Sequence, residues 1–85
     1  MQTSKTTVTT TATKVLDKRP YPREVLIHNE SGAFFIGGTS GVTSLNGFKL
    51  DNKDKIQFEL DTNTELWVIT ASGTAECFVL DTISP

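Results

Sequence analysis

The chain has almost none of the residues that cross-link small proteins through disulfides or metal. Cys77 is the only cysteine and His28 the only histidine among its 85 residues. A disulfide within one chain is therefore excluded, and one Cys with one His cannot complete a tetrahedral zinc site. A chain of this length buries only about two-thirds of the surface that it exposes when unfolded. Because small folds without cross-links usually depend on oligomerisation, we expect this chain to associate with itself or to dock on a larger body.

An excess of charge and long apolar runs are also missing. The net charge is −2 and neither sign forms a long run, so the sequence shows no basic stripe for nucleic acid and no polybasic membrane patch. The longest apolar runs, such as residues 33–36, are far shorter than the ~20 residues of a membrane span. Residues 1–5 are polar and do not form the apolar core of a signal peptide. These features predict a protein that is made and folded in a cytosol and binds neither nucleic acid nor membrane.

No segment has the apolar period of ~3.6 residues that a helix needs, whereas period-two and β-branched segments recur between turns. In residues 55–61, Ile56, Phe58 and Leu60 share one side of an extended chain, as in an antiparallel sheet with one buried face. The spacing predicts an all-β fold, a compact antiparallel β-sandwich or small β-barrel of about seven to eight short strands. Residues 1–85 are predicted to form a single β domain, in which residues 1–10 could be an extended N-terminal arm. The expected strands are residues 5–16, 24–29, 33–37, 48–50, 55–61, 65–71 and 74–82.

Two pairs of these strands are predicted to form hairpins. A tight turn at residues 30–32 separates the second and third expected strands, and a turn at Ser72 and Gly73 separates the last two. Consecutive strands joined by such short turns usually pair with each other in one sheet.

Residues that could carry chemistry are few and isolated. His28 lies in an apolar strand without the signature of a catalytic partner, and Cys77 is expected to be a small core residue. Residues 51–54 resemble the start of a calcium loop but lack its following glycine and distant glutamate. No helix follows the glycines of residues 37–41, which are expected to permit positive φ or a close backbone approach rather than to bind phosphate. We therefore expect no catalytic, cofactor-binding or metal-binding residue, no cofactor, and a protein that is not an enzyme.

The arginine and aromatic residues favour contacts with other molecules. Residues 19–23, RPYPR, contain two prolines and are expected to form an exposed rigid turn that presents two arginines and a tyrosine, residue types that are common in interfaces. Trp67 has an apolar neighbour on each side and is expected in the core or in an interface.

Several spaced motifs resemble those of small β-rich structural proteins of tailed bacteriophages. They are VLIHNESG at residues 25–32, FIGG at 35–38, VTSLNGFKL at 42–50 and LWVITASGTA at 66–75. The motifs stand in the order that this family has, and the resemblance extends over residues 11–80.

The resemblance implies a virion component without catalytic residues. The main hypothesis is a capsid decoration (cement) protein, a homotrimer that binds the outside of the major capsid protein and stabilises the capsid. It would be made in the host bacterial cytoplasm and lie on the capsid surface of the virion. The N-terminal arm could then add a strand to a neighbour's sheet. The residues predicted in the partner interface are Val8, Thr10, Arg19, Tyr21, Arg23 and Trp67.

The alternative hypothesis is a receptor- or glycan-binding module of a head or tail fibre. Trp67, Tyr21 and the Gly37–Gly47 loop would form its site, because exposed aromatic rings offer a platform for a sugar. The sequence leaves both hypotheses open.

Overall fold

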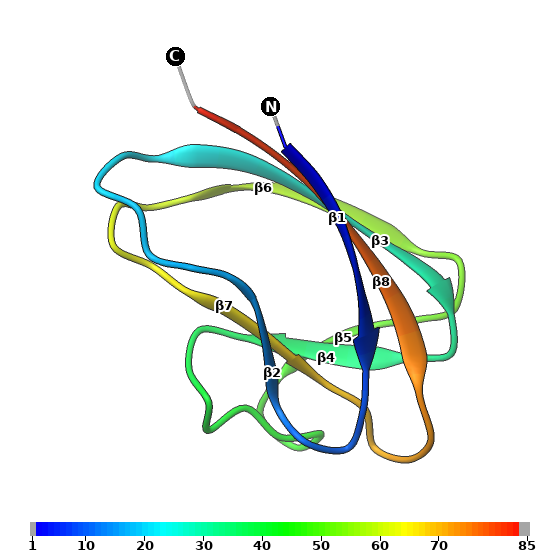
Figure 1. Ribbon diagram of the computed structural model, residues 1–85. Helices are drawn as coiled ribbons and strands as arrows, with labels where there is room; N and C mark the ends of the chain where they lie inside the picture. Colours follow the sequence, from blue (N-terminus) through cyan, green and yellow to red (C-terminus); the bar gives the residue numbers. More distant parts are fainter. Residues whose placement is uncertain (1, 84–85) are drawn as a thin grey trace.

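Eight antiparallel strands in two layers make up the part of the chain that the structure describes, residues 2–83 of this computed structural model (Figure 1). Four strands form sheet A, in the order β1-β8-β3-β6, and four form sheet B, in the order β2-β7-β4-β5. The expected all-β fold is confirmed, and the two facing sheets make it a small sandwich. The strands are β1 (Gln2–Val8), β2 (Thr13–Leu16), β3 (Arg23–Ser31), β4 (Phe34–Gly37), β5 (Phe48–Leu50), β6 (Lys55–Leu60), β7 (Leu66–Ile69) and β8 (Ala75–Ile83).

The core lies between the inner faces of the two sheets. In β3, Val25 and Ile27 are buried, whereas Leu26 and His28 face outward, as the pleat of a strand requires. Cys77 of β8 is fully buried, which confirms its expected place in the core, and burial raises the pKa of its thiol to about 12. The other members of the core are Val8, Leu16, Phe34, Ile36, Leu50, Leu60, Leu66, Val68, Ala75 and Val79.

β6 has the alternation that its sequence predicts. Leu60 is buried, and Ile56 and Phe58 pack against the core from the same face. The residues between them are exposed on the outer face of sheet A. A shift of this strand by one residue would turn its polar side chains toward the core, so the alternation fixes which face lies inward.

Residues 5–16 are not one strand, contrary to the prediction. β1 ends at Val8, and β2 begins at Thr13 in the other sheet. Between them, Thr9 Oγ1 accepts a hydrogen bond from the Thr11 amide at 3.2 Å, and Thr13 Oγ1 donates to the Thr11 carbonyl at 3.0 Å. These threonine hydroxyls bind backbone groups locally, and so support a corner where the β-branched composition predicted a continuous strand.

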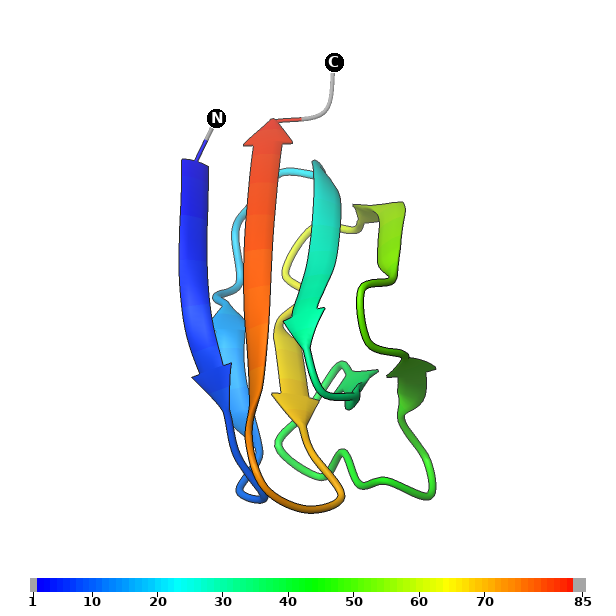
Figure 2. The same cartoon turned by 90° about the vertical axis from the view of Figure 1, so that its right-hand side faces the viewer.

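The segment expected to be an extended N-terminal arm is for the most part the edge strand β1. Its residues pair with β8 from Gln2 opposite Asp81 to Val8 opposite Ala75, and Figure 2 shows the two strands side by side. Residue 1 lies outside the described residues. The ladder satisfies backbone groups of β1 within its own chain, so this segment is part of the sandwich rather than a separate arm.

Both predicted hairpins are wrong, because the two turns cross between the sheets. β3 belongs to sheet A and β4 to sheet B, while β7 belongs to sheet B and β8 to sheet A. Each turn contains a glycine with positive φ, Gly32 at 76° and Gly73 at 67°. The carbonyl of each glycine accepts a hydrogen bond from a buried side chain three residues earlier, from Asn29 Nδ2 at 2.8 Å and from Thr70 Oγ1 at 3.0 Å. These buried donors hold the turns toward the interior, so the chain enters the opposite sheet.

Candidate functional site

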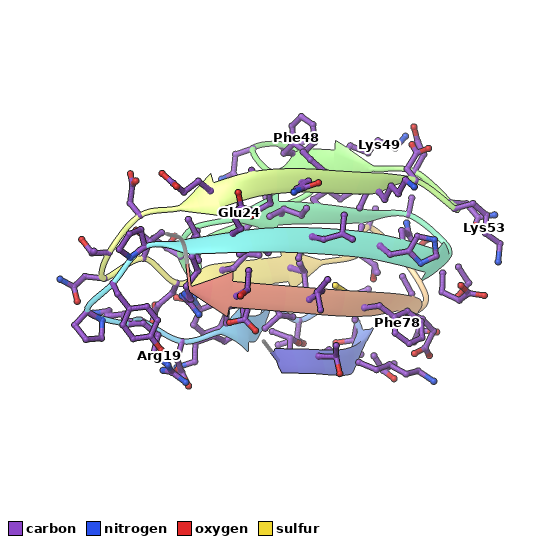
Figure 3. The ribbon with its side chains drawn as sticks, turned by 90° about the horizontal axis from the view of Figure 1, so that it is seen from above. Arg19, Glu24, Phe48, Lys49, Lys53 and Phe78 are labelled. Atoms are coloured by element: carbon purple, nitrogen blue, oxygen red, sulfur yellow. The ribbon has the colours of Figure 1, made fainter. Side chains whose placement is uncertain are left out.

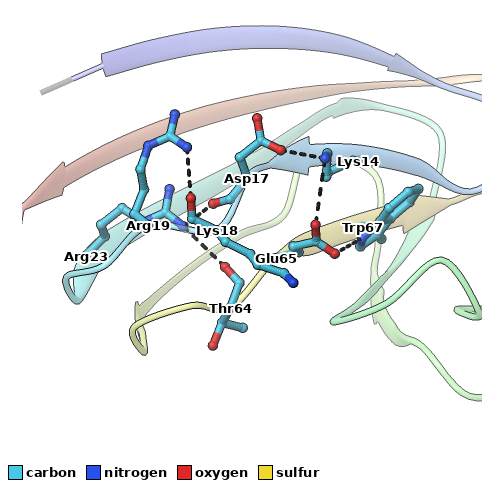
Figure 4. Close-up of polar contacts among 8 residues, drawn as sticks. All are labelled: Lys14, Asp17, Lys18, Arg19, Arg23, Thr64, Glu65 and Trp67. Carbon is cyan, nitrogen blue, oxygen red and sulfur yellow. Dashed lines mark hydrogen bonds and ion pairs between the residues drawn. The ribbon is translucent and has the colours of Figure 1, made fainter.

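Arg23 is buried at one end of the sandwich, so its predicted place in an exposed turn and a partner interface is wrong. The residue is 2% exposed, and its guanidinium lies 3.4 Å from the carboxylate of Asp81. It also donates hydrogen bonds to the backbone carbonyls of Asp17 at 2.7 Å and Thr64 at 3.3 Å (Figure 4). β3 begins at Arg23 in the same register as the inward-facing Val25, which turns the side chain between the sheets. Arg23 therefore closes this end of the sandwich.

Val8 was also predicted in the partner interface, and this is wrong as well. The residue is 0% exposed. It pairs with Ala75, whose side chain is also buried, so both face sheet B. A contact between Val8 and another molecule would require the sandwich to open.

The other predicted interface residues are not brought together. Thr10 is exposed in the β1–β2 connection, whereas Arg19 and Tyr21 lie in the β2–β3 connection, at the opposite end of β2. The Arg19 carbonyl accepts a hydrogen bond from the Asn63 amide at 2.7 Å, which joins this connection to the β6–β7 turn. That Thr10, Arg19 and Tyr21 contact a partner stays a prediction.

Trp67 points outward from β7, on the outer face of sheet B, because the residues on either side of it are buried. Its Nε1 donates a hydrogen bond to the Glu65 carboxylate at 3.2 Å, and the Lys14 ammonium lies 6.0 Å from the ring centroid (Figure 4). The ring is thus half-buried among charged neighbours of its own sheet. Tyr21 belongs to the β2–β3 connection, so the platform of two rings expected for a glycan-binding site stays a prediction.

The glycine-rich loop, residues 38–47, folds back over the outer face of sheet B. Val42 packs directly on Gly37, which has no side chain. A Cβ at position 37 would come within 2.6 Å of the Val42 side chain. Gly47 lies on Phe35 in the same way, because an added Cβ would come within 2.7 Å of the Phe35 Cβ. Val42 is buried as a result. The two glycines allow the close backbone approach that lets this loop cover β4.

The tip of this loop is held by hydrogen bonds to its own backbone. Asn46 Oδ1 accepts a hydrogen bond from the Thr43 amide at 2.7 Å, Thr43 Oγ1 accepts one from the Leu45 amide at 3.2 Å, and the Gly47 amide donates to the Thr43 carbonyl at 2.9 Å. Leu45 is 96% exposed at the tip, and Phe48 in the adjacent β5 is 59% exposed. We call Leu45, Phe48 and the loop between them the loop ridge.

Sequence reasoning placed the Gly37–Gly47 loop in the alternative glycan site but did not single out Leu45 and Phe48 as exposed apolar side chains. Figure 3 shows Phe48 at the edge of the molecule, beyond β6. The signal was the sequence LNGF of residues 45–48, in which an apolar residue stands directly on each side of an Asn-Gly turn. Apolar side chains at that position either pack under the turn or remain exposed, and only the tertiary structure distinguishes the two.

The outer face of sheet A carries three rows of side chains that run across its strands, and Glu76 and Glu30 extend it beyond the first row, where they lie 3.6 Å from Lys5 and 3.8 Å from His28. We call these rows the sheet A face, and in the described chain no loop lies over it (Figure 3). The first row has three basic side chains and a phenylalanine, the second is apolar at its centre, and the third has two carboxylates. In register, the basic row is Lys5, Phe78, His28 and Lys55, the apolar row is Thr3, Leu80, Leu26 and Gln57, and the acidic row is Thr82, Glu24 and Glu59.

Residues with reactive side chains are spread over the molecule. The His28 ring lies 6.4 Å from that of Phe78, and its Nδ1 is 3.8 Å from the Glu30 carboxylate, whereas Cys77 lies on the inner side of sheet A. Within residues 2–83, no group of three or more His, Cys, Asp or Glu side chains is placed to hold a metal ion. The same residues include no helix of the length and apolarity needed to cross a membrane.

The geometry therefore offers two surfaces for contact, the loop ridge and the sheet A face. Both consist of side chains fixed on strands or on a hydrogen-bonded loop, which suits recognition of another macromolecule. Comparison of the chain with models of protein families, with curated proteins and with solved structures finds no match.

Proposed function

We propose that this protein is a structural component of a bacteriophage particle, a capsid decoration protein that contacts the outside of the major capsid protein through the loop ridge. The observation that carries the proposal is the exposure of Leu45 and Phe48, at 96% and 59%, on an ordered segment. The phage-like motif at residues 42–50 contains both of them. The site of action in this proposal is the capsid surface of the virion, and the homotrimer expected from the resemblance stays a prediction.

The loop ridge is suited to binding because little order has to be gained. An apolar side chain on a flexible loop loses conformational freedom when it binds, at about 0.5–1.5 kcal/mol for each immobilised side chain. The Leu45 backbone is already fixed by hydrogen bonds to Thr43 and around Asn46. Beside it, Lys49 pairs with Asp51 at 3.4 Å and supplies a polar rim to the apolar contact. A modest contact of this kind becomes strong when many copies bind one lattice.

Counting the copies in purified particles tests the proposal directly. Quantitative mass spectrometry should find a copy number comparable to that of the major capsid protein. A handful of copies per particle would place the protein in the neck, tail or fibre and contradict decoration.

Binding to capsids from which the protein is missing tests the surface. The double variant Leu45→Ser/Phe48→Ser should bind at least about tenfold more weakly, with its circular dichroism unchanged because both side chains are exposed. Asp61→Asn is the matched control, since Asp61 is an exposed residue outside the loop ridge, in the connection after β6, and it should bind normally. Equal binding by the double variant would rule out the loop ridge. Loss of host-cell or glycan binding in Trp67→Ala, with no binding to capsids by the unchanged protein, would favour the fibre module instead.

A further inference from the structure

The sheet A face has an order of charge that makes it complementary to itself, most directly at Lys55 and Glu59, because Lys5 and His28 also have the carboxylates of Glu76 and Glu30 beside them in their own chain. Its basic row and its acidic row lie on opposite sides of the apolar row, about 7 Å from it on each side, since alternate residues of a strand are ~6.6 Å apart. Figure 3 shows Glu24 and Phe78 toward opposite ends of this face. Phe78 is in the basic row and Glu24 in the acidic row.

We propose that the sheet A face binds the same face of a second copy of this chain, around a two-fold axis that lies in the interface along the apolar row. Such an axis makes the strands of the two copies antiparallel and brings each basic row over the acidic row of the other copy. Lys55 then faces Glu59 across the interface, and His28 faces Glu24. Leu26 and Leu80, at the centre of the apolar row, each face the same residue of the second copy.

The charges distinguish this axis from the other two-fold arrangement of the same faces. An axis parallel to the strands would bring the β1 edge of one copy over the β6 edge of the other, so that Lys5 faces Lys55. In the acidic rows, Glu24 would face Thr82, so the repulsion in this arrangement comes from the two lysines. Like charges placed opposite one another are destabilising, so the pattern selects the axis along the apolar row.

The shape of the face fits the same arrangement. A hollow of 210 Å³ lies between the apolar and acidic rows, bordered by Glu24, Gln57 and Thr82. A second hollow of 160 Å³ lies between the apolar and basic rows, bordered by His28 and Phe78. The proposed axis places the Phe78 ring of one copy above the hollow beside Thr82 in the second copy. Phe78 is 38% exposed and so is available for this contact.

The size of the face predicts a weak, reversible dimer. Four strands ~4.8 Å apart and ~25 Å of strand length give roughly 500 Å² per copy, or roughly 1,000 Å² in total. This is near the lower limit for a specific interface, so an association that depends on protein concentration is expected. The proposal does not depend on the loop ridge, which is a different surface, but the two-fold dimer is an alternative to the homotrimer expected from the resemblance.

Sedimentation equilibrium of the full chain tests the dimer. The unchanged protein should pass from monomer to dimer as its concentration rises toward about 1 mM. The single charge reversals Lys55→Glu and Glu59→Lys should each raise the Kd at least about tenfold, because each places like charges together twice in the dimer. The double variant Lys55→Glu/Glu59→Lys should recover a Kd within about threefold of the original value, since the reversed charges face each other again.

The control is Lys49→Glu, which reverses an exposed lysine on sheet B and should leave the Kd unchanged. Urea unfolding of every variant at low concentration shows whether its fold is intact. A chain that stays monomeric, a trimer, or a dimer that does not respond to the reversals would overturn the proposal. Normal capsid binding by Leu45→Ser/Phe48→Ser would contradict the role of the loop ridge but not the dimer. The two proposals can therefore be disproved separately.

Discussion

The outer faces of the two sheets are built differently. The chain covers part of sheet B with its own loop 38–47, in which Val42 lies on Gly37. No part of the described chain lies over the corresponding face of sheet A (Figures 1 and 3). Both faces consist of the outward residues of strands with period-two alternation, so alternation alone does not explain the difference.

The difference is explained by side-chain size at a few outward positions. On sheet B, Gly37 has no side chain, and Gly47 of the loop can approach the ring-bearing Phe35. On sheet A, the central outward positions are occupied by the larger side chains of Leu26 and Phe78, and none of the outward residues in the three rows is a glycine. In this molecule, the outer face that the chain itself covers is the one where glycine allows a close backbone approach.

The largest effect is expected in the labelling of Cys77, which tests whether sheet A is loosely packed behind its open face. Cys77 lies directly behind this face and is fully buried. A thiol reagent at about pH 8 should label it about 1,000-fold more slowly in the folded than in the urea-unfolded protein, which corresponds to an opening free energy of about 4 kcal/mol. Mass spectrometry of the labelled chain measures the rate. Fast labelling of the folded protein would show that sheet A opens locally. The difference between the two outer faces would then reflect loose packing of sheet A and not the size of its outward side chains.

The same thiol gives this test a pH dependence. Burial raises the pKa of Cys77 from 9.0 to about 12. Because the folded pKa is the higher one, the neutral thiol contributes stability in full below about pH 9, and this contribution is lost as the pH rises toward 12.

The next largest effect is expected when a substitution displaces loop 38–47 from the outer face of sheet B. Gly37→Ala adds a Cβ that would lie 2.6 Å from the Val42 side chain, so the loop must move away from β4. We expect a loss of about 2 kcal/mol in the free energy of unfolding, measured by urea denaturation. Gly38→Ala is the matched control, because its Cβ would have only the Glu65 carbonyl oxygen near it, at 4.0 Å. Equal midpoints for the two variants would mean that the loop does not depend on Gly37.

The smallest effect concerns the charged edge of sheet B. The hydrogen bond from Lys14, and then its charge, lower the pKa of the Asp17 carboxyl below its ordinary value of 3.8. Since the folded pKa is the lower one, the Asp17 carboxylate contributes to stability above about pH 3.8, and the contribution is lost as the pH falls through the folded pKa. Lys14→Ala should return this pKa toward its ordinary value, as followed by NMR titration, and shift the fluorescence of Trp67. Lys49→Ala should change neither, and an unaltered Asp17 pKa in Lys14→Ala would contradict the contact.

The strands could be predicted from the sequence better than their pairing. β6 was predicted with its inward residues because Ile56, Phe58 and Leu60 alternate within one short segment. The two hairpins were not, because the turns after Asn29 and Thr70 depend on buried hydrogen bonds. Asn29 Nδ2 also lies within 2.9 Å of the Leu50 carbonyl, a group distant in sequence. No local pattern reports such a contact.

The candidate site was predicted less well than the fold. Arg23 follows two prolines in sequence and was expected to be exposed, but its guanidinium is held by Asp81, which is remote in the chain. Val8 ends a threonine-rich segment, and only pairing with β8 turns it toward the core. Conversely, Leu45 is an apolar residue of a type that is usually buried in the core, yet it is almost fully exposed. Exposure depends on what the rest of the chain places around a residue, and single segments do not contain that information.

The sequence by itself determined that this chain is all-β, and it determined which residues of a strand such as β6 face inward. Both follow from local physics, since β-branched residues favour extended backbone and a pleated strand alternates its side chains. Only the tertiary structure decided which sheet each strand joins, that Arg23 closes one end of the sandwich, and that sheet B is covered while sheet A is open. These features depend on contacts between residues far apart in the chain, such as Arg23 with Asp81 and Val42 with Gly37, and on space that only the folded molecule defines.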